Sequence, residues 1–277
     1  MKYKELYNFG TSALKEVGIA EADLDARLLL EFICHTSRHD LLVHGEKEVA
    51  EECKEAYINC IERRKTREPL QHITGEQEFM GLTFEVNPHV LIPRQDTEVL
   101  VEEAMIHLHD GMHVLDMCTG SGCILLSLLH YSNDCVGLGV DISQEAVETA
   151  RRNAEKLQIN DSAFIISDLF ASVEGQFDLI VSNPPYIPTE VIPGLMEEVR
   201  KYEPIGALDG KGNGLFFYDR IIQEAPKHLN GGGYLFFEIG HDQASAVMQR
   251  MENAGYLGVT VVKDFAGLDR VVYGYIS

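Results

Sequence analysis

Positive charge is scarce in this chain of 277 residues. It has 23 lysine and arginine residues against 44 aspartate and glutamate residues, a formal net charge of −21. Proteins that bind nucleic acids or anionic membranes draw much of their affinity from basic side chains that neutralise phosphates. The deficit therefore argues against a dedicated binder of either kind. Hydrophobic residues make up 45% of the chain, too many for an acidic disordered protein, so we expect a globule with small-molecule or protein partners.

Three further features are missing. Residues 1–7 contain no apolar segment typical of a secretory signal, and no stretch has the length and apolarity of a membrane span. The six cysteines form no C-x-x-C pair and no zinc-type spacing with histidine. The sequence therefore predicts a cytoplasmic protein with reduced, mostly buried thiols and without a metal site.

The first region, residues 1–73, shows the apolar spacing of helices. Leu24, Leu28 and Phe32 form one stripe. A second stripe consists of Ala50, Cys53, Tyr57, Cys60 and Ile61. We expect a helical N-terminal domain, either an ordinary packed bundle or a domain that recognises the substrate.

The spacing changes in residues 74–95, which we predict to be a β-hairpin linker. Leu82, Phe84 and Val86 alternate with polar residues, and Asn87-Pro88 is a turn signal before the apolar residues 90–92. Residues 93–98 should end the strand and cap a helix.

Strand and helix patterns alternate in the last region, residues 96–277. The predicted strands are residues 113–117, 135–141, 163–167, 177–182, 234–239, 259–264 and 270–276. This alternation predicts an α/β fold with a doubly wound, mainly parallel sheet of seven strands. The last two strands are too close for a crossover helix and should form an antiparallel hairpin at the sheet edge.

A glycine-containing turn, Cys118-Thr119-Gly120-Ser121-Gly122, joins the first of these strands to a helix that starts near Cys123. Such turns let the backbone approach a ligand at the carboxyl end of a strand. Asp141 ends the next strand, where an acid can accept hydrogen bonds from both ribose hydroxyls. The third glycine of a dinucleotide site is absent, so a ribose cofactor without phosphate fits better, namely S-adenosylmethionine. After the third strand, Asp168 can bond the adenine amine, with Leu169 or Phe170 against the ring.

The most specific motif is Asn183-Pro184-Pro185-Tyr186, at the end of the fourth strand. The two prolines have no N–H, and a proline pushes the residue before it toward extended geometry. The Asn183 side-chain oxygen and the Pro184 carbonyl can therefore accept both hydrogens of a planar –NH₂ group. Tyr186 can pack on that group and help to exclude water. A proline-rich turn without function is the weaker alternative.

These motifs together resemble class I S-adenosylmethionine-dependent methyltransferases that act on planar nitrogens. The resemblance implies a Rossmann-like fold in which Asn183, Pro184 and Tyr186 are catalytic and Pro185 joins them in binding the substrate. It implies cofactor binding by Cys118, Thr119, Gly120, Ser121, Gly122, Asp141, Asp168, Leu169 and Asn183. The four-residue motif does not distinguish enzymes that methylate adenine or guanine of nucleic acid from those that methylate glutamine.

Other segments resemble the HemK-type glutamine methyltransferases of peptide chain release factors. They are residues 68–75, 91–98 and 207–215, and Cys118 and Gln95 stand where that family commonly has Gly and Pro. The resemblance implies transfer to the N5 amide nitrogen of the glutamine in the Gly-Gly-Gln motif of class 1 release factors, with S-adenosylhomocysteine as product and a monomeric enzyme.

Two other functions compete with this one. A nucleic-acid amino-methyltransferase should carry basic stripes, but the basic clusters are limited to residues 63–65 and 151–152. A non-catalytic adaptor with a vestigial cofactor fold would not need the intact motifs. The roles of Arg94, Thr97 and Glu98 stay open, because they could line the site or cap a helix.

Overall fold

The computed structural model describes residues 1–277, which form two compact units. The first unit contains Met1–Gly75 and Met196–Tyr202, and the second contains Glu76–Leu195 and Glu203–Ser277. The chain therefore passes between the units three times, after Gly75, Leu195 and Tyr202. None of its helices has the length and apolar character needed to cross a bilayer.

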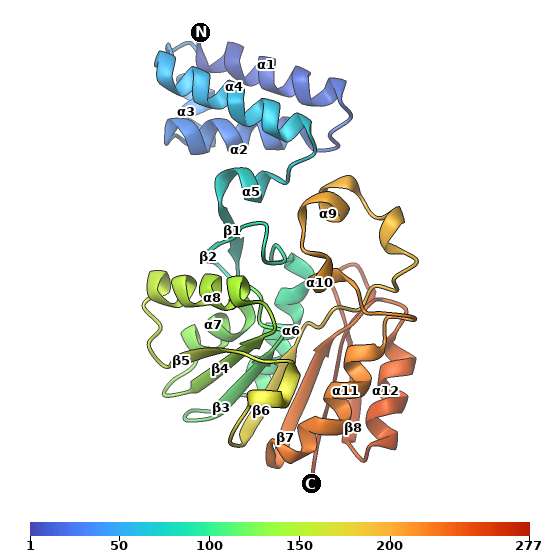
Figure 1. Ribbon diagram of the computed structural model, residues 1–277. Coiled ribbons are helices and arrows are strands. Elements are labelled where there is room, and N and C mark those ends of the chain that lie inside the picture. The colour runs from blue at the N-terminus through green and yellow to red at the C-terminus, as the bar shows by residue number, and fades with distance from the viewer. The chain divides into compact units, whose positions relative to one another are not determined.

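The first unit is a bundle of helices (Figure 1). Its elements are α1 (Tyr3–Glu16), α2 (Ala22–Cys34), α3 (Arg38–Val43), α4 (Glu51–Lys65), α5 (Leu70–Thr74) and α9 (Glu197–Tyr202). The predicted stripe on α4 is largely confirmed, because Tyr57, Cys60 and Ile61 are buried.

The predicted stripe on α2 is wrong. Leu24 and Phe32 are 37% and 40% exposed, whereas Ala26, Leu29 and Leu30 face the core. The helix carries two apolar stripes with helical spacing, and packing against α1 and α4 selects the one that contains Ala26, Leu29 and Leu30.

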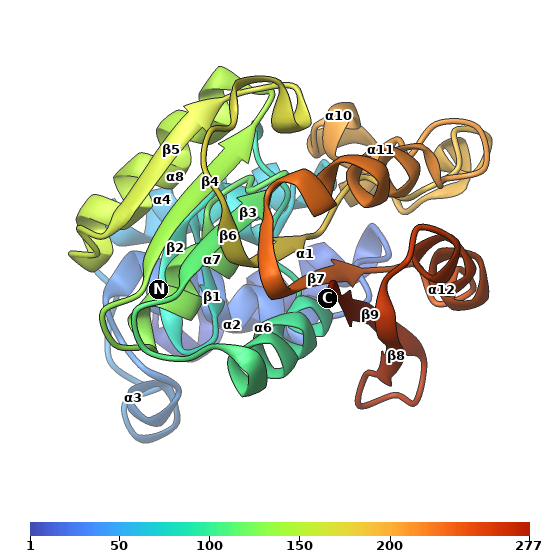
Figure 2. The ribbon, with the colours of Figure 1, turned by 90° about the horizontal axis from the view of Figure 1, so that it is seen from below.

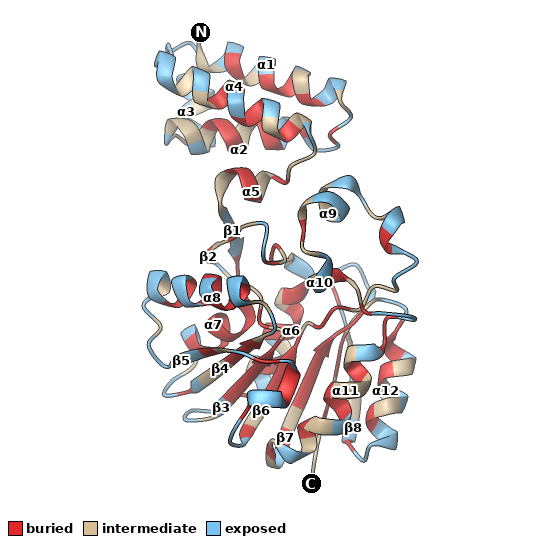
Figure 3. Ribbon diagram, viewed as in Figure 1, coloured by how far each residue is buried: buried red, intermediate tan, exposed pale blue.

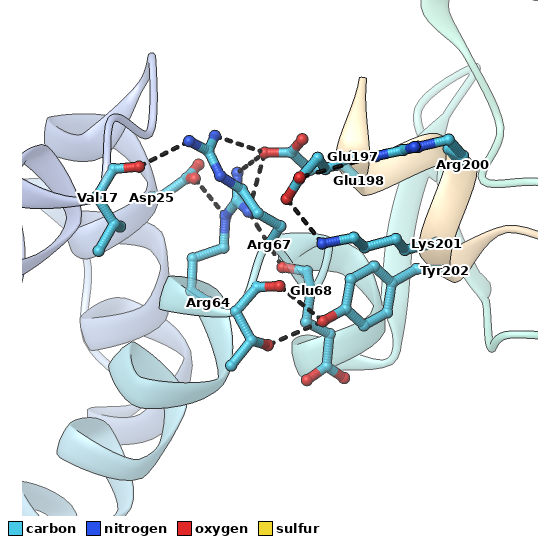
Figure 4. Close-up of polar contacts among 11 residues, drawn as sticks. Val17, Asp25, Arg64, Arg67, Glu68, Glu197, Glu198, Arg200, Lys201 and Tyr202 are labelled. Atoms are coloured by element: carbon cyan, nitrogen blue, oxygen red, sulfur yellow. Dashed lines mark hydrogen bonds and ion pairs between the residues drawn. The ribbon is translucent and has the colours of Figure 1, made fainter. Parts of the chain in front are cut away.

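A salt-bridge cluster ties the segment Met196–Tyr202 to the bundle (Figure 4). Buried Arg64 donates to Asp25 at 2.8 Å and contacts Glu198 at 3.4 Å. Arg67 donates to the same Glu198 carboxylate at 3.3 Å and to the Val17 carbonyl at 2.6 Å. The two arginines thus share one carboxylate from a distant part of the sequence.

The second unit is built on a seven-stranded sheet, which confirms the predicted fold class. Its strands are β3 (His113–Met117), β4 (Val136–Asp141), β5 (Ser162–Ile166), β6 (Phe177–Ser182), β7 (Leu229–Glu238), β8 (Leu257–Lys263) and β9 (Asp269–Tyr275). Their order is β5-β4-β3-β6-β7-β9-β8, and β3 to β7 run parallel. The predicted antiparallel hairpin of β8 and β9 is present, with β8 at the edge.

Helices cover both faces of this sheet (Figures 1 and 2). They are α6 (Gln95–His107), α7 (Cys123–His130) and α8 (Gln144–Leu157) on one face and α11 (Phe216–Glu224) and α12 (Ala244–Asn253) on the other. Short elements complete the unit: α10 (Ile205–Leu208), η1 (Leu169–Ser172), η2 (Ile192–Gly194) and η3 (Ala225–Lys227). Neighbouring strand residues such as Phe236 and Phe237 point to opposite faces, so both faces are apolar, and the central strands β3, β6 and β7 are largely buried (Figure 3).

The hairpin before the sheet differs from its prediction. It consists of β1 (Glu76–Phe79) and β2 (Leu82–Glu85), and its turn is Met80-Gly81 rather than Asn87-Pro88. Residues 90–92 form no strand. Met80 and Gly81 both have positive φ, as a type I′ hairpin turn requires, and the Glu98 carboxylate accepts the Met80 N–H at 2.7 Å. Glu98 therefore holds the hairpin, and α6 begins after Arg94 without the expected side-chain cap.

Candidate functional site

A cavity of about 410 Å³ lies in the second unit, at the carboxyl edge of the sheet. Its walls come from the ends of β3, β4 and β6, the segments that follow them, and residues 89–97 and 204–211. The strand order reverses at β3, since β4 and β5 lie on one side of it and β6 on the other. Doubly wound sheets bind ligands at such a reversal, and the cavity has the size typical of small-molecule sites.

The turn after β3 forms one wall of the cavity. Cys118, Thr119, Gly120 and Ser121 line it, whereas Gly122 does not. Instead, Gly122 has φ +80° at the start of α7, and a Cβ there would lie 3.1 Å from the Cβ of Ala150. Gly122 therefore serves the shape of the turn and the packing of α7 against α8.

A buried carboxyl group supports the turn from below. The Thr119 hydroxyl donates to Asp116 at 2.6 Å, and Asp116 is fully buried. Burial raises the pKa of Asp116 to about 7, although the bond from Thr119 opposes the change. The sequence analysis gave no role to Asp116, which lies two residues before the turn.

Asp141 lies at the end of β4 and faces the cavity. Its two carboxylate oxygens accept the backbone N–H groups of Gly120 at 2.9 Å and Ser143 at 3.0 Å. Burial raises the pKa of Asp141, and these two bonds oppose that shift. The carboxylate joins the two strand-end turns, and its remaining lone pairs can accept from a ligand diol.

The segment after β5 contributes Asp168 and Leu169 to the lining. Asp168 accepts a hydrogen bond from Arg220 at 2.8 Å. Phe170 is buried and stacks on His228 with ring centres 4.8 Å apart. Of the two apolar side chains that the sequence offered for a ligand ring, Leu169 is therefore the one at the cavity.

The Asn-Pro-Pro-Tyr motif follows β6 directly. Asn183 and Pro185 line the cavity, Pro184 is buried, and the Tyr186 ring packs against the core on the face covered by α11 and α12. The Tyr186 hydroxyl donates to Glu238 at 3.1 Å, and its carbonyl accepts from the Gln243 side chain at 3.0 Å. Burial raises the pKa of the Tyr186 hydroxyl, so this group is a hydrogen-bond donor and not a base.

A second glycine-rich segment braces the motif. Ile187 N–H donates to the Leu208 carbonyl at 3.1 Å, and Gly210 N–H donates to the Ile187 carbonyl at 2.9 Å. A Cβ on Gly210 would lie 2.7 Å from the Tyr186 Cα, and one on Gly214 would lie 2.2 Å from the Tyr186 oxygen. Only glycine allows this approach, which explains Gly210 and Gly214 within residues 207–215.

The structure also places Arg94 and Thr97, whose roles the sequence left open. Arg94 and Thr97 line the cavity, and Arg94 forms an ion pair with buried Glu203. Glu238, which the sequence did not single out, lies at the carboxyl end of β7 and contacts Tyr186 and Thr97. The available signal was a single acid inside the otherwise apolar run of residues 234–239.

Both regions of the chain are similar to known protein families. Residues 5–75 match the family described as the PrmC N-terminal domain, and residues 108–264 match a methyltransferase domain family. The chain is 41% identical to the release factor glutamine methyltransferase of Clostridium acetobutylicum over 98% of both chains. It is 43% identical to the enzyme of the same name from Geobacter sulfurreducens, over 95% of this chain and 93% of that one.

A solved structure with a similar fold is a methyltransferase from Pyrococcus furiosus. The TM-score is 0.54 at 24% sequence identity, and the match covers 70% of this chain and 89% of the other. This likeness concerns the fold alone.

Proposed function

The chain belongs to the release factor glutamine methyltransferases, and from this membership we propose how its cavity carries out the reaction. The enzyme methylates a glutamine of a peptide chain release factor. We propose S-adenosylmethionine as the methyl donor and the N5 amide nitrogen of the glutamine in the Gly-Gly-Gln motif of class 1 release factors as the acceptor. The observation that carries this proposal is that Asn183 faces the same cavity as Asp141.

The residues at the cavity fit this cofactor, which supplies an electrophilic methyl group on a sulfonium. We propose that the Asp141 carboxylate accepts from the two ribose hydroxyls and that residues 118–121 wrap the methionine part of the molecule. Asp168 would accept from the adenine amine, with Leu169 against the ring. Gly122 gives the turn its conformation without lining the cavity.

On the acceptor side, we propose that the Asn183 side-chain oxygen and the Pro184 carbonyl accept the two hydrogens of the glutamine –NH₂. This holds the nitrogen in line with the methyl group, so that positioning lowers the barrier. The same two oxygens stabilise the positive charge that develops on nitrogen. No strong base is required, because an N-methylated, protonated amide releases its proton readily to water. Pro185 and Tyr186 would support the planar group and exclude solvent.

Replacing Asn183 with Ala tests this assignment. The variant should bind S-adenosylmethionine with affinity close to that of the unchanged enzyme, because Asp141 and residues 118–121 are intact. Methyl transfer to release factor should fall by about 100-fold or more, as expected when one charge-stabilising group is removed from an active site. Calorimetry would measure the affinity, and transfer of labelled methyl would measure the rate. Asn160→Ala, at an exposed position beyond α8, is the matched control. Full transfer activity in Asn183→Ala would contradict the assignment.

The proposed partners are protein and cofactor, without direct binding to nucleic acid. The net charge of −21 supports this choice, since a nucleic-acid enzyme needs basic surface. Incubation with labelled cofactor and either release factor or DNA separates the two substrates. Label should appear on release factor and disappear when its glutamine is replaced. We also propose that the enzyme is cytoplasmic and monomeric. Light scattering in solution tests the oligomeric state.

A further inference from the structure

A short chain of buried side chains lies behind Asn183. Glu238 ends β7, and the Thr97 hydroxyl in the first turn of α6 lies 2.5 Å from its Oε2. The Asn183 Nδ2 lies 3.4 Å from the same Thr97 oxygen. Thr97 and Glu238 are each 2% exposed. The chain thus connects the end of β7, the start of α6 and the motif after β6.

The direction of donation along this chain is fixed by elementary bonding. A threonine hydroxyl has one proton, and a carboxylate can only accept. Thr97 therefore gives its proton to Glu238, and its oxygen is left to accept. An asparagine amide has a donor end and an acceptor end of nearly the same shape. Only the donor end, Nδ2, is compatible with the accepting oxygen of Thr97.

Both oxygens of Glu238 accept a hydrogen bond from a hydroxyl group, Oε2 from Thr97 and Oε1 from Tyr186. Burial raises the pKa of Glu238, while the bond from Thr97, the positive charge of Arg270 and the bond from Tyr186 lower it, and Asp96 raises it slightly. Arg270 is itself held by Asp264 at 2.9 Å and Asp96 at 3.2 Å. Glu238 therefore organises both polar residues of the motif, Asn183 through Thr97 and Tyr186 directly.

We propose that Thr97, backed by Glu238, is a positioning residue that orients the Asn183 amide so that its oxygen, and not its –NH₂, faces the substrate nitrogen. This inference rests on the role proposed above for Asn183. With the amide reversed, two N–H groups would point at the hydrogens of the glutamine amide, and the acceptor needed in the reaction would be lost. Thr97 thus selects one of two orientations of the Asn183 amide, which have nearly the same shape but present either an acceptor or a donor to the substrate.

The test compares Thr97→Val with Thr97→Ser. Valine keeps the shape and removes the hydroxyl, so the Asn183 amide loses its fixed orientation. We expect kcat to fall about 10- to 100-fold, a range typical for residues that orient a group in an active site. The Kd for S-adenosylmethionine should change less than about threefold, because the ribose and methionine contacts are intact. Thr97→Ser keeps the hydroxyl and should restore most of the activity.

Thr149→Val is a closely matched control. Thr149 is also fully buried in the second unit, its hydroxyl donates to a carbonyl, and its oxygen accepts from the side-chain amide of Asn87 at 2.9 Å. It does not line the cavity. Thr149→Val should cost stability for the same reason as Thr97→Val, but it should leave kcat unchanged. Equal losses of kcat in both variants would show a general effect of removing a buried hydroxyl and would overturn the inference.

A double-variant comparison separates this role from a purely structural one. If Thr97 acts through Asn183, then Thr97→Val should add little to the loss already present in Asn183→Ala, measured in single-turnover transfer. Independent, multiplicative losses would contradict the inference. Should Thr97→Val fail to fold, Glu238→Gln supplies the same test, because it removes the fixed acceptor of the Thr97 proton and should lower kcat as well.

The outcomes distinguish this inference from the proposed function. An unchanged enzyme that transfers no label to release factor would refute the proposed function. An active enzyme whose Thr97→Val variant is equally active would refute only the positioning role of Thr97.

Discussion

Asp116 is a residue whose environment makes stability depend on pH. Its pKa is 3.8 in the unfolded chain and about 7 in the folded one, so the folded state binds the extra proton between these values. The stabilisation is present in full below pH 4 and is lost as the pH rises through about 7. Between these two pKa values, the free energy of unfolding changes by about 1.4 kcal/mol per pH unit.

Asp116→Asn, which is neutral at every pH, should remove this contribution. We expect the difference in unfolding free energy between Asp116→Asn and the unchanged protein to shift in favour of the variant from pH 5 to pH 7, and then to level off. Urea denaturation at pH 5, 6, 7 and 8 measures it. Because Asp141, Glu203 and Glu238 are present in both proteins, the comparison isolates Asp116. A difference that is constant from pH 5 to pH 8 would show that Asp116 does not titrate in this range.

Among single residues, the sequence identified the site residues that directly follow strands. It did not identify the residues from other parts of the chain that contact them. Asp141 and Asn183 come directly after strands, and carboxyl ends of parallel strands must share one edge. Thr97 and Glu238 are more than a hundred positions apart, and nothing local indicates that they touch. Cys118 was predicted only in part. The sequence shows that it replaces a common glycine, but its φ of +64°, which explains that glycine, is visible only in the structure.

At the scale of elements, the segment that braces the Asn-Pro-Pro-Tyr motif is the most sensitive to packing. A methyl group on Gly210 would meet backbone atoms of Pro185 and Tyr186 at 2.7–2.8 Å, so the motif would have to move. We expect Gly210→Ala to lower methyl transfer at least about tenfold, because displacements of about 1 Å in an active site have large effects on rate. Stability should fall by about 1–3 kcal/mol, which is typical of overpacking.

The control for this change is Gly194→Ala. A Cβ at Gly194 meets no atom within 4 Å, and the residue belongs to the same stretch that follows the motif. Transfer assays and thermal unfolding of both variants give the comparison. Retention of full activity in Gly210→Ala would mean that the motif tolerates a shift of its backbone.

Elements were predicted best where periodicity and turn signals agree. Six of the seven strands lie within two residues of their predicted limits, whereas β7 begins at Leu229, five residues before its predicted start. Apolar runs in the centre of the sheet are buried on both faces and so have sharp limits. The hairpin turn was misplaced because Asn87-Pro88 is a stronger local signal than Met80-Gly81, and the pairing of β1 with β2 decides the register. The division at residues 1–73, 74–95 and 96–277 stays a prediction.

For the whole molecule, the excess of negative charge gives a prediction about association. Release factors bind ribosomes and need basic surfaces, so the net charge of −21 should speed their encounter with this enzyme. Raising the salt concentration from about 0.05 to 0.5 M should slow association, because it shortens the screening length. The rate of the chemical step at saturating substrate should not change. Stopped-flow association and single-turnover transfer measure the two rates, and salt-independent association would exclude this steering.

The salt-bridge cluster of the first unit has a consequence for how the protein is made. Synthesis proceeds from the N-terminus, so Arg64 and Arg67 leave the ribosome with Asp25 already made but with Glu198 still to come. The helical bundle is thus the first unit whose synthesis begins, but it still lacks one segment when Gly75 has been made. Its last segment, Met196–Tyr202, is translated only after the Asn-Pro-Pro-Tyr motif, so the contacts of Arg64 and Arg67 with Glu198 cannot form before that motif has been made.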